Sequence, residues 1–478
     1  MSALRRLAQR LTALPSPMVA GLLAVVAALL AARLLGLTWL LAVNVPFSDQ
    51  WALLTRLYNG FQWSDAAIAF IWQHGPHRQG LNFSLVLPAY HFSDWNVRWD
   101  SLWTACVQLV AGLLALRLRR RLLPAPWSLW DAVLLLAFWG VCTFETLVVA
   151  PNASHSIFPL LLLMLLLNVW LAAPGLLNHL ALIALVVCLG FTGFGLTALP
   201  ALMLVALIDV WRGAGAQRQR AMVVLAAGVL TLLAFLHRYQ FVVSADGFQV
   251  LRPDPTDYLR FMAAMLSHFL LMLQRPSPWV LYPAGALLLA AWVVAWLWGV
   301  RHLSRPAAER DGERTLWQVC VVLIGCSLVF ALLTAYGRAQ LGVGAAMASR
   351  YTALLLPGLL AVYLLLFQHR DRLGPLLLVL LLLFAARVLP ETREAYLLGR
   401  YYAGMKLCWL EQYRAGGDVA AADVRLQALD ARAQFQPGWL GRQAQWDLME
   451  QQRLGPLAPG APSEPLLRLY PQPCSLLR

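Results

Sequence analysis

Residues 47–100 read FSDQWALLTRLYNGFQWSDAAIAFIWQHGPHRQGLNFSLVLPAYHFSDWNVRWD and lie between the first two long apolar segments of the chain. They contain four aspartates, three histidines, three arginines and five tryptophans. Ionisable side chains are costly inside a bilayer, so this density beside apolar segments indicates a region outside the hydrocarbon layer. We therefore interpret residues 43–100 as a large extracytoplasmic loop that carries functional residues.

The composition is that of a membrane protein. Of the 478 residues, 60% are hydrophobic and 13% are charged, and the apolar runs are long enough to cross a bilayer as helices. We therefore predict an all-α, polytopic membrane protein. The net charge of +14 comes mainly from short arginine clusters between apolar runs, a pattern that membrane topology alone produces. We expect no nucleic-acid partner.

Hydropathy predicts about eleven transmembrane helices. They lie near residues 18–42, 101–116, 129–149, 157–172, 178–193, 196–211, 221–237, 278–300, 315–336, 353–368 and 374–389. Arg260 and His268 interrupt the stretch 258–274, which we expect to be an interfacial helix. The positive-inside rule then places the N-terminus in the cytoplasm and the loop 43–100 in the periplasm of a bacterial inner membrane. We expect the first apolar segment to stay as a signal anchor.

The chain divides into two predicted units. Residues 1–389 form the transmembrane domain, and residues 390–478, rich in Arg, Gln, Ala and Leu, form a small helical extracytoplasmic tail. Two cysteines, Cys408 and Cys474, lie in this tail. In an oxidising compartment they form either a disulfide or two free thiols, and the sequence leaves both alternatives open.

Asp49 lies a few residues beyond the first span. A carboxylate at the membrane surface can take a proton from an acceptor while a lipid-linked donor stays partly in the bilayer. The alternative is a helix cap, with Ser48 or Asp49 beginning a helix over residues 50–60. Trp51 and Trp63 would then anchor that region at the membrane interface. The two interpretations are compatible.

The sequence His74-Gly-Pro-His77-Arg78 is the second polar feature of the loop. A glycine and a proline between the histidines prevent the helix that would place both imidazoles on one face, which disfavours a metal site. Histidine and arginine at a membrane surface suit recognition of a phosphate or a sugar. A purely structural role in the loop is the alternative.

Further candidates lie at the outer ends of later spans. Arg338 and Ser349-Arg350-Tyr351 flank the ninth and tenth spans; the arginines either reach the interface or grip a lipid phosphate. Glu145, near the outer end of the third span, is costly unless it faces water or protein, so it is a candidate second carboxylate. Arg33 lies within the first span and predicts an interior ion pair. The glycine-rich turn 190–195 does not follow a strand, so it is no nucleotide-binding motif.

The loop and span arrangement resembles the GT-C glycosyltransferases, polytopic enzymes that use polyprenyl-phosphate sugars. The chain is similar to a family of bacterial GT-C-like membrane proteins in five short motifs: Asp49-x-Trp51, Gly60, His74-x-x-His77-Arg78, Trp95-Asn96-x-Arg98 and Ser349-Arg350-Tyr351. The resemblance implies that Asp49 activates the acceptor for inverting attack on the anomeric carbon. It implies that His77, Arg78 and Arg350 stabilise the phosphate leaving group.

The motif departs from the family pattern at the carboxylate. Ser48 and Gln50 flank Asp49, so the usual acidic pair is missing and a divalent cation is allowed without being required. Asp65, Asp94 or Glu145 would supply any second carboxylate. We expect no dedicated metal site.

The expected function is transfer of a sugar from a polyprenyl-phosphate donor to a periplasmic acceptor, which is a glycan, a lipid or a surface protein such as a pilin. Asp49 is the expected catalytic residue. The expected substrate-binding residues are His74, His77, Arg78, Glu145, Arg338, Arg350 and Tyr351. The alternatives are an O-antigen polymerase or ligase, a lipid-glycan flippase or transporter, and a structural membrane scaffold. Transport would need ionisable groups near mid-membrane, where Arg33 is the main example.

Overall fold

The structure is a computed structural model of the chain. It describes residues 6–7, 10–11, 14–54, 57, 60–242, 248–272, 277–305, 313–432, 442–460 and 464–477. These residues fold almost entirely into helices, with one two-stranded hairpin among them, as the all-α prediction requires.

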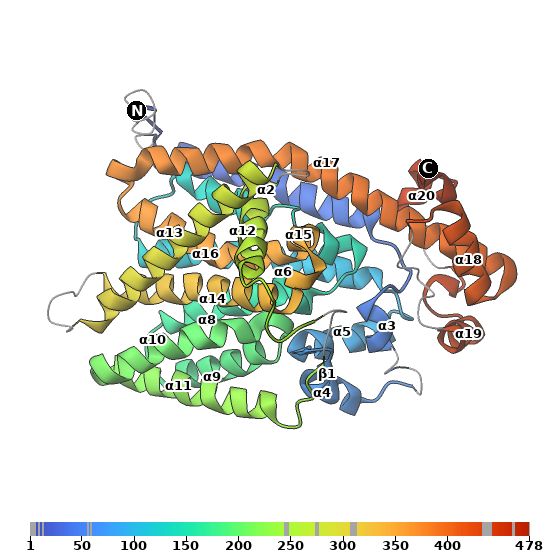
Figure 1. Ribbon diagram of the computed structural model, residues 1–478, viewed down its shortest axis with the longest axis horizontal. Helices are drawn as coiled ribbons and strands as arrows, with labels where there is room; N and C mark the ends of the chain where they lie inside the picture. Colours follow the sequence, from blue (N-terminus) through green and yellow to red (C-terminus); the bar gives the residue numbers. More distant parts are fainter. Residues whose placement is uncertain are drawn as a thin grey trace.

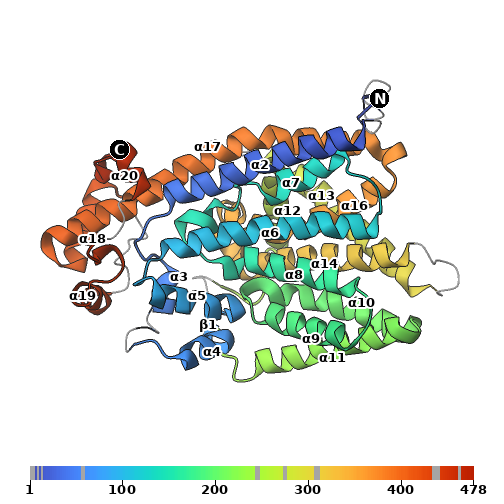
Figure 2. The same cartoon turned by 180° about the vertical axis from the view of Figure 1, so that it is seen from behind.

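Long helices run along the longest axis of the molecule (Figures 1 and 2). Within the described part of the chain, eight helical segments are long and apolar enough to cross a membrane. Their elements are α2 (Ser16–Leu41), α6 (Arg98–Leu122), η5 and α10 (Gly193–Ala198, Leu199–Arg212), α11 (Gly215–Leu236), α13 (Pro278–Ser304), α14 and η7 (Arg314–Arg338, Ala339–Leu341), η8 and α16 (Ser349–Leu355, Leu356–Gln368), and α17 (Arg370–Gly416). A membrane-embedded helical protein is therefore supported.

Three shorter apolar segments complete the set of predicted spans. They are η2 with α7 (Leu129–Asp131, Ala132–Phe138), α8 (Ile157–Trp170) and α9 (Leu176–Gly190). The number of spans, about eleven, and their direction through the membrane stay predictions.

The helices differ in how much of their surface the protein covers. In α14, residues 318–327 are buried on every side, which is typical of a helix at the centre of a bundle. Helices α2 and α13 instead expose large apolar side chains such as Leu29 and Leu287, the latter 72% exposed. Exposed apolar surface of this extent fits contact with lipid.

The ion pair expected for Arg33 is present, between α2 and α17. Arg33 Nη2 lies 3.9 Å from Glu391 Oε2, and Glu391 Oε1 lies 2.7 Å from Arg387 Nη2. Arg33 also donates to the carbonyl of Trp139, and Arg387 donates to that of Phe269. These bonds connect α2, α7, α12 (Thr256–Leu271) and α17. Removing one partner of such a buried network would leave a charge unpaired.

Helix α12 covers most of the stretch 258–274, for which we expected an interfacial helix; its place relative to the membrane stays a prediction. Its residues 261–269 are all buried, packed mainly against α13 and α14. The contact with α13 is close, because a Cβ atom at Gly285 would lie 1.7 Å from the carbonyl oxygen of Ala263. This half of the helix has no face left for lipid. The hydropathy of the sequence did not predict this burial, because hydropathy does not show which residues neighbouring helices will cover.

The predicted loop 43–100 is a folded unit. It contains α3 (Asp49–Leu54), α4 (Trp63–Ile71), the hairpin strands β1 (Gln73–His74) and β2 (His77–Arg78), and α5 (Gly80–Phe92). The unit lies at the same end of the bundle as the C-terminal residues, which we call the tail end (right in Figure 1).

The tail is helical, as predicted. It comprises the end of α17, then α18 (Val419–Leu429), α19 (Gln443–Gln451), η9 (Gly455–Leu457), α20 (Pro465–Leu469) and η10 (Pro473–Leu477). The predicted domain boundary at residues 389 and 390 falls inside α17, which continues through Pro390. At 1.5 Å per residue, this 47-residue helix is about 70 Å long. One helix therefore joins both predicted units.

Loop and tail share an apolar core. Trp51 of α3 is 3% exposed, and its ring lies 5.3 Å from that of Trp446 in α19, which in turn contacts Trp409 of α17. The prediction that Trp51 anchors the chain at the membrane interface is therefore wrong, whereas Trp63 is exposed. Of the expected helix over residues 50–60, the structure describes α3, which begins at Asp49 and includes residues up to Leu54; residues 55–56 and 58–59 lie outside the described residues.

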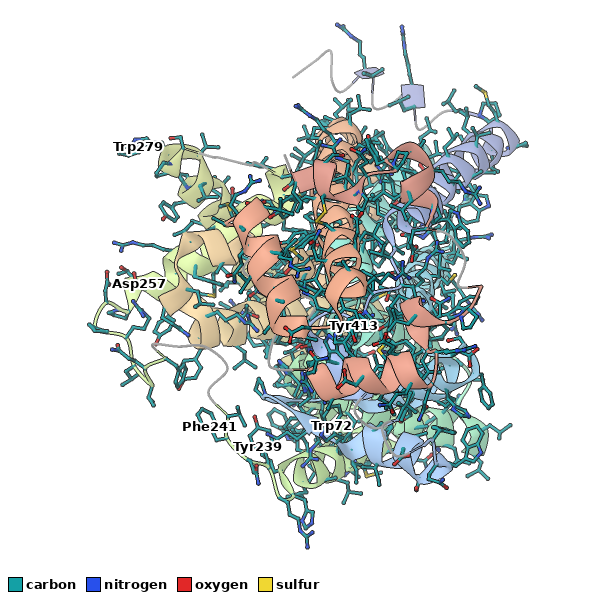
Figure 3. All side chains as sticks on the ribbon, turned by 90° about the vertical axis from the view of Figure 1, so that its right-hand side faces the viewer. Trp72, Tyr239, Phe241, Asp257, Trp279 and Tyr413 are labelled. Atoms are coloured by element: carbon teal, nitrogen blue, oxygen red, sulfur yellow. A yellow bond between two sulfur atoms is a disulfide. The ribbon has the colours of Figure 1, made fainter. Side chains whose placement is uncertain are left out.

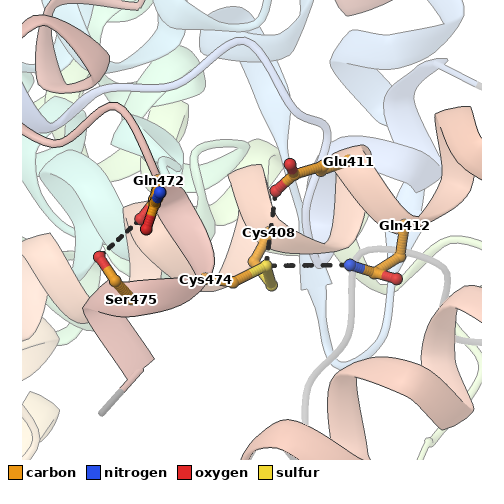
Figure 4. The surroundings of a disulfide bond; sticks show 6 residues. All are labelled: Cys408, Glu411, Gln412, Gln472, Cys474 and Ser475. Carbon is orange, nitrogen blue, oxygen red and sulfur yellow. Dashed lines mark hydrogen bonds between the residues drawn. A yellow bond between two sulfur atoms is a disulfide. The ribbon is translucent and has the colours of Figure 1, made fainter.

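A disulfide joins Cys408 of α17 to Cys474 of η10 (Figure 4). Of the two alternatives for these cysteines, the structure has the disulfide. Such bonds persist in oxidising compartments, which is consistent with an extracytoplasmic tail.

We predict that Cys474→Ser loosens the tail. The disulfide closes a loop of 66 residues, for which the chain-entropy contribution is about 4 kcal/mol. Hydrogen exchange of residues 443–451 and 465–477 should therefore accelerate in the variant and, under reducing conditions, in the wild type. Cys106→Ser, which removes a free thiol, is the control. Equal exchange in the wild type and both variants would contradict the prediction.

Candidate functional site

A cavity of about 380 Å³ lies at the tail end between the folded loop and the ends of the long helices. Six of the eight residues selected from the sequence line it: Asp49, His74, His77, Glu145, Arg338 and Arg350. They come from α3, the hairpin, η3 (Glu145–Val149), α14 and η8.

Asp49 is the first residue of α3, and its carboxylate accepts hydrogen bonds from two directions. His74 Nε2 lies 3.2 Å from Oδ1, and Asn152 Nδ2 lies 3.2 Å from Oδ2. His155 Nδ1 is 3.7 Å from Oδ2. An ionised carboxylate only accepts hydrogen bonds, so His74 carries its proton on Nε2. The preceding residue, Ser48, has a φ of 55°, a conformation costly outside glycine that fits strain at a functional site.

The charge states of the site follow from these contacts. Burial favours the neutral acid at Asp49, but the His74 and Asn152 hydrogen bonds and the two nearby imidazoles hold its pKa below the ordinary range. Burial lowers the pKa of His155 to about 4 despite the attraction of Asp49. Burial, with the neighbouring His155 and Arg338, also lowers the pKa of His77. At neutral pH the cavity therefore holds one ionised aspartate beside neutral His77 and His155.

Glu145 is a counter-ion within the cavity. Its carboxylate pairs with the guanidinium of Arg350 and accepts from the Arg350 backbone N–H at 3.4 Å. Its own backbone N–H donates to Ser349 Oγ at 3.1 Å. Glu145 begins a single π-helical turn, a feature that recurs at functional sites. The candidate second carboxylate is thus already paired with an arginine.

Arg338 differs from Arg350 in its partners. It lies at the C-terminal end of α14 and lines the cavity, yet no carboxylate of the described residues lies within salt-bridge distance of it. A cation without an acidic partner is free to bind an anionic group.

Two predicted residues lie outside the cavity. The Arg78 guanidinium donates to the backbone carbonyls of Ile71, Phe235 and His237, so it fastens the hairpin to the end of α11. It is therefore not placed to contact a substrate phosphate. Tyr351 is buried beneath Arg350, with its ring against Phe330.

The selection from the sequence missed His155 and Asn152, which lie in and just before η4 (Ala153–His155). Asn152 is 103 residues from Asp49 in the chain, so no local pattern connects them. The only signal was that Pro151-Asn-Ala-Ser-His155 follows Glu145 at the end of a predicted span.

The glycine-rich turn 190–195 also belongs to the site. Gly193 has a φ of 44°, and a Cβ atom there would lie 2.0 Å from the carbonyl oxygen of Ser154. This close approach places the next residue, Phe194, against His77 with ring centroids 4.3 Å apart. The glycine thus allows Phe194 to form one wall of the cavity.

The tail supports the site from behind. Lys406 of α17 donates to the carbonyl of Val148 in η3 at 3.3 Å. Glu464, just before α20, accepts from the backbone N–H of Asn44 at 2.7 Å and pairs with Arg98 at 3.5 Å. These contacts fix the start of the loop and the turn that holds Glu145.

A second, mostly apolar cavity of about 260 Å³ adjoins the first. The two share Pro76, His77, Phe194 and Arg338 as lining residues. The rest of the lining is mainly apolar and aromatic, from the C-terminal parts of α11 and α14 and the segment after α11. Figure 3, which looks onto the tail end, shows two lining residues, Tyr239 and Phe241, beside one another near the edge of the molecule.

The described residues contain no cluster of side chains that forms a metal-binding site. No group of three or more of their His, Cys, Asp or Glu side chains is arranged to hold an ion. The dependence on a divalent cation stays a prediction.

Comparison with known proteins found no matching family model, curated protein or solved structure. The likeness to GT-C glycosyltransferases therefore stays a prediction that rests on the sequence motifs.

We predict that the free energy of unfolding decreases as the pH is lowered from 7 to 5, because the folded protein holds His155 in its neutral form. The pKa of His155 is about 4 in the folded protein and 6.5 in the unfolded chain. As the pH drops, the unfolded chain therefore binds the proton first. The loss is about 1–2 kcal/mol at pH 5 and continues toward pH 4. Thermal unfolding at both pH values should show a smaller drop for His155→Asn. An equal drop in wild type and variant would contradict this account.

Proposed function

We propose that the protein transfers a sugar from a polyprenyl-phosphate carrier to an acceptor hydroxyl at the cavity around Asp49. The proposal rests chiefly on one observation: a polar cavity with an ionised carboxylate and two arginines shares four lining residues with an apolar cavity. A polyprenyl-phosphate sugar has groups in the matching order: a polar sugar and a charged phosphate suit the polar cavity, and a hydrocarbon chain suits the apolar one.

Asp49 is the proposed base. The acceptor hydroxyl gives its proton to the carboxylate while its oxygen forms the bond to the anomeric carbon. The bond from that carbon to the phosphate oxygen breaks, and polyprenyl phosphate leaves with the electron pair. An acceptor that takes the place of His74 or His155 beside Asp49 removes a stabilising contact, which raises the pKa of the carboxylate toward that of a useful base.

Arg338 and Arg350 are the proposed partners of the phosphate. Negative charge grows on the leaving group as its bond breaks, and fixed cations lower the energy of that state. Arg338 has no carboxylate partner among the described residues, so it meets the phosphate with its full charge. Arg350, held in place by Glu145, supplies a fixed donor.

The apolar cavity is the proposed place for the first part of the prenyl chain. Phe235, Tyr239 and Phe241 line it, and the last is 71% exposed, which fits an opening toward lipid. A carrier could then slide in from the bilayer without taking its chain into water.

The disulfide supports an oxidising side for the cavity, because both lie at the tail end. We therefore propose that the cavity faces the periplasm of a bacterial inner membrane, with the N-terminus in the cytoplasm. The acceptor is then a glycan, a lipid or a surface protein.

A transporter is a weaker candidate. It would be favoured by ionisable groups inside the bundle, and Arg33, Arg387 and Glu391 are such groups. However, both arginines pair with Glu391 and donate to backbone carbonyls, and the three residues line neither cavity described above. Their contacts indicate a structural clamp.

We predict that Asp49→Asn abolishes one glycan modification in the native host. The amide keeps the size of the side chain but cannot accept a proton, so transfer should fall at least ~100-fold. Intact masses of surface glycans and glycoproteins report the missing sugar, and immunoblots compare the amounts of protein in the membrane.

The matched control is Asp371→Asn, an exposed carboxylate at the start of α17. The proposal fails if deletion of the gene changes a glycan whereas the Asp49→Asn protein, present at normal amounts, leaves it intact.

We also predict that Arg338→Gln lowers turnover by roughly 10- to 1000-fold, because one charged partner of the leaving phosphate is lost. Arg393→Gln, on the exposed side of α17, is the control for loss of charge. The same glycan masses, followed over time after induction, give the rate. Full turnover in Arg338→Gln would remove this arginine from the proposed mechanism.

A further inference from the structure

The end of α6 that lies away from the tail end carries an arginine cluster. Arg117, Arg120 and Arg121 are exposed and line a cavity of about 400 Å³ together with Trp127, Leu113 and Leu116. Residues three and four apart share one face of a helix, so the three guanidinium groups project from the same side. None of these residues takes part in the site around Asp49.

The cluster lacks negative charge of its own. No carboxylate of the described residues lies within salt-bridge distance of the three arginines. Their neighbour Arg119 is instead buried and pairs with buried Asp131. The helix therefore contains two arginines that pair with a carboxylate, Arg98 and Arg119, and three that do not.

Two of the three arginines are held in place by neutral groups. Arg120 lies 4.6 Å from the centre of the Trp127 ring, and Arg121 donates to the carbonyl oxygen of Asn168 in α8. Arg117 has no ion pair or hydrogen bond with a described residue. Neutral contacts fix the positions of the charges without cancelling them, so an anion would find them in place.

An apolar stripe continues from the cluster toward the middle of α6. Leu113 and Val110, one and two turns from Arg117, are 53% and 45% exposed. A ligand that fits both parts has an anionic head and a hydrocarbon chain.

We propose that this cluster is a binding site for an anionic glycerophospholipid, with the phosphodiester among Arg117, Arg120 and Arg121 and an acyl chain along Leu113 and Val110. Basic pockets at the membrane surface bind such headgroups. From Arg98 at the tail end to Arg120, α6 rises about 33 Å, so this site is separate from the proposed sugar-transfer site and at the other end of the bundle. The proposal does not depend on the proposed function.

Native mass spectrometry of the purified full-length protein tests this proposal. The protein is given equal amounts of phosphatidylglycerol and phosphatidylcholine, and the ratio of bound lipids is measured. The variant Arg117→Gln/Arg120→Gln/Arg121→Gln should lower the preference for phosphatidylglycerol on the order of 10- to 100-fold. The control Arg218→Gln/Arg301→Gln/Arg372→Gln removes as many exposed arginines from other helices and should keep the wild-type ratio.

The single variant Arg117→Gln covers the case in which the triple variant does not fold, because this arginine bonds to no described residue; it should lower the ratio by several fold. Equal ratios in wild type, variants and control would overturn the proposal. Competition with sodium phosphate separates lipid from a soluble anion: retention of phosphatidylglycerol at 10-fold molar excess of phosphate supports the lipid, and displacement overturns it.

Discussion

The carboxylate of Asp49 is the constraint on which the arrangement of the tail end depends. A partly buried carboxylate needs hydrogen-bond donors, and Asp49 takes them from the hairpin and from the segment before α8. Meeting this need brings together residues 49, 74 and 152. The Gly193 contact and the Glu145–Arg350 pair then close the cavity around them. The hydrogen bonds of one side chain thus join three segments that are separate in the sequence.

The tail gives this arrangement its rigidity. Trp446 packs against Trp51, two residues after Asp49, and Trp409 packs against Trp446. The disulfide at Cys408 holds the last helical turn to α17. Within the bundle, the pair of Arg33 and Glu391 joins α2 to α17. Positioned groups gain most when their supporting residues are themselves fixed. A folded loop, a bracing tail and a clamped bundle together allow an aspartate and two arginines to keep their places.

Much of this was predictable from the sequence. The predicted topology put polar residues such as Asp49, His74, His77 and Arg350 on one side of the chain's spans, and in the structure these four residues line one cavity. Asn152, which donates to Asp49, and His155, which lies beside it, were missed because their contacts with Asp49 join segments about a hundred residues apart. The burial of α12 and Trp51 was not predicted, because hydropathy reports the preference of a residue for lipid over water. It does not show whether other helices will cover that residue. The side chain of Arg78 lies outside the cavity because its guanidinium donates its hydrogen bonds to backbone carbonyls.

The most direct measurement is a structure of the purified protein with a short-chain polyprenyl phosphate. The account predicts the phosphate within hydrogen-bond distance of Arg338 or Arg350 and the prenyl chain between the ends of α11 and α14. A phosphate bound at another place, or no binding at saturating concentration, would contradict the central claim that the two adjoining cavities form one site for a lipid-linked substrate.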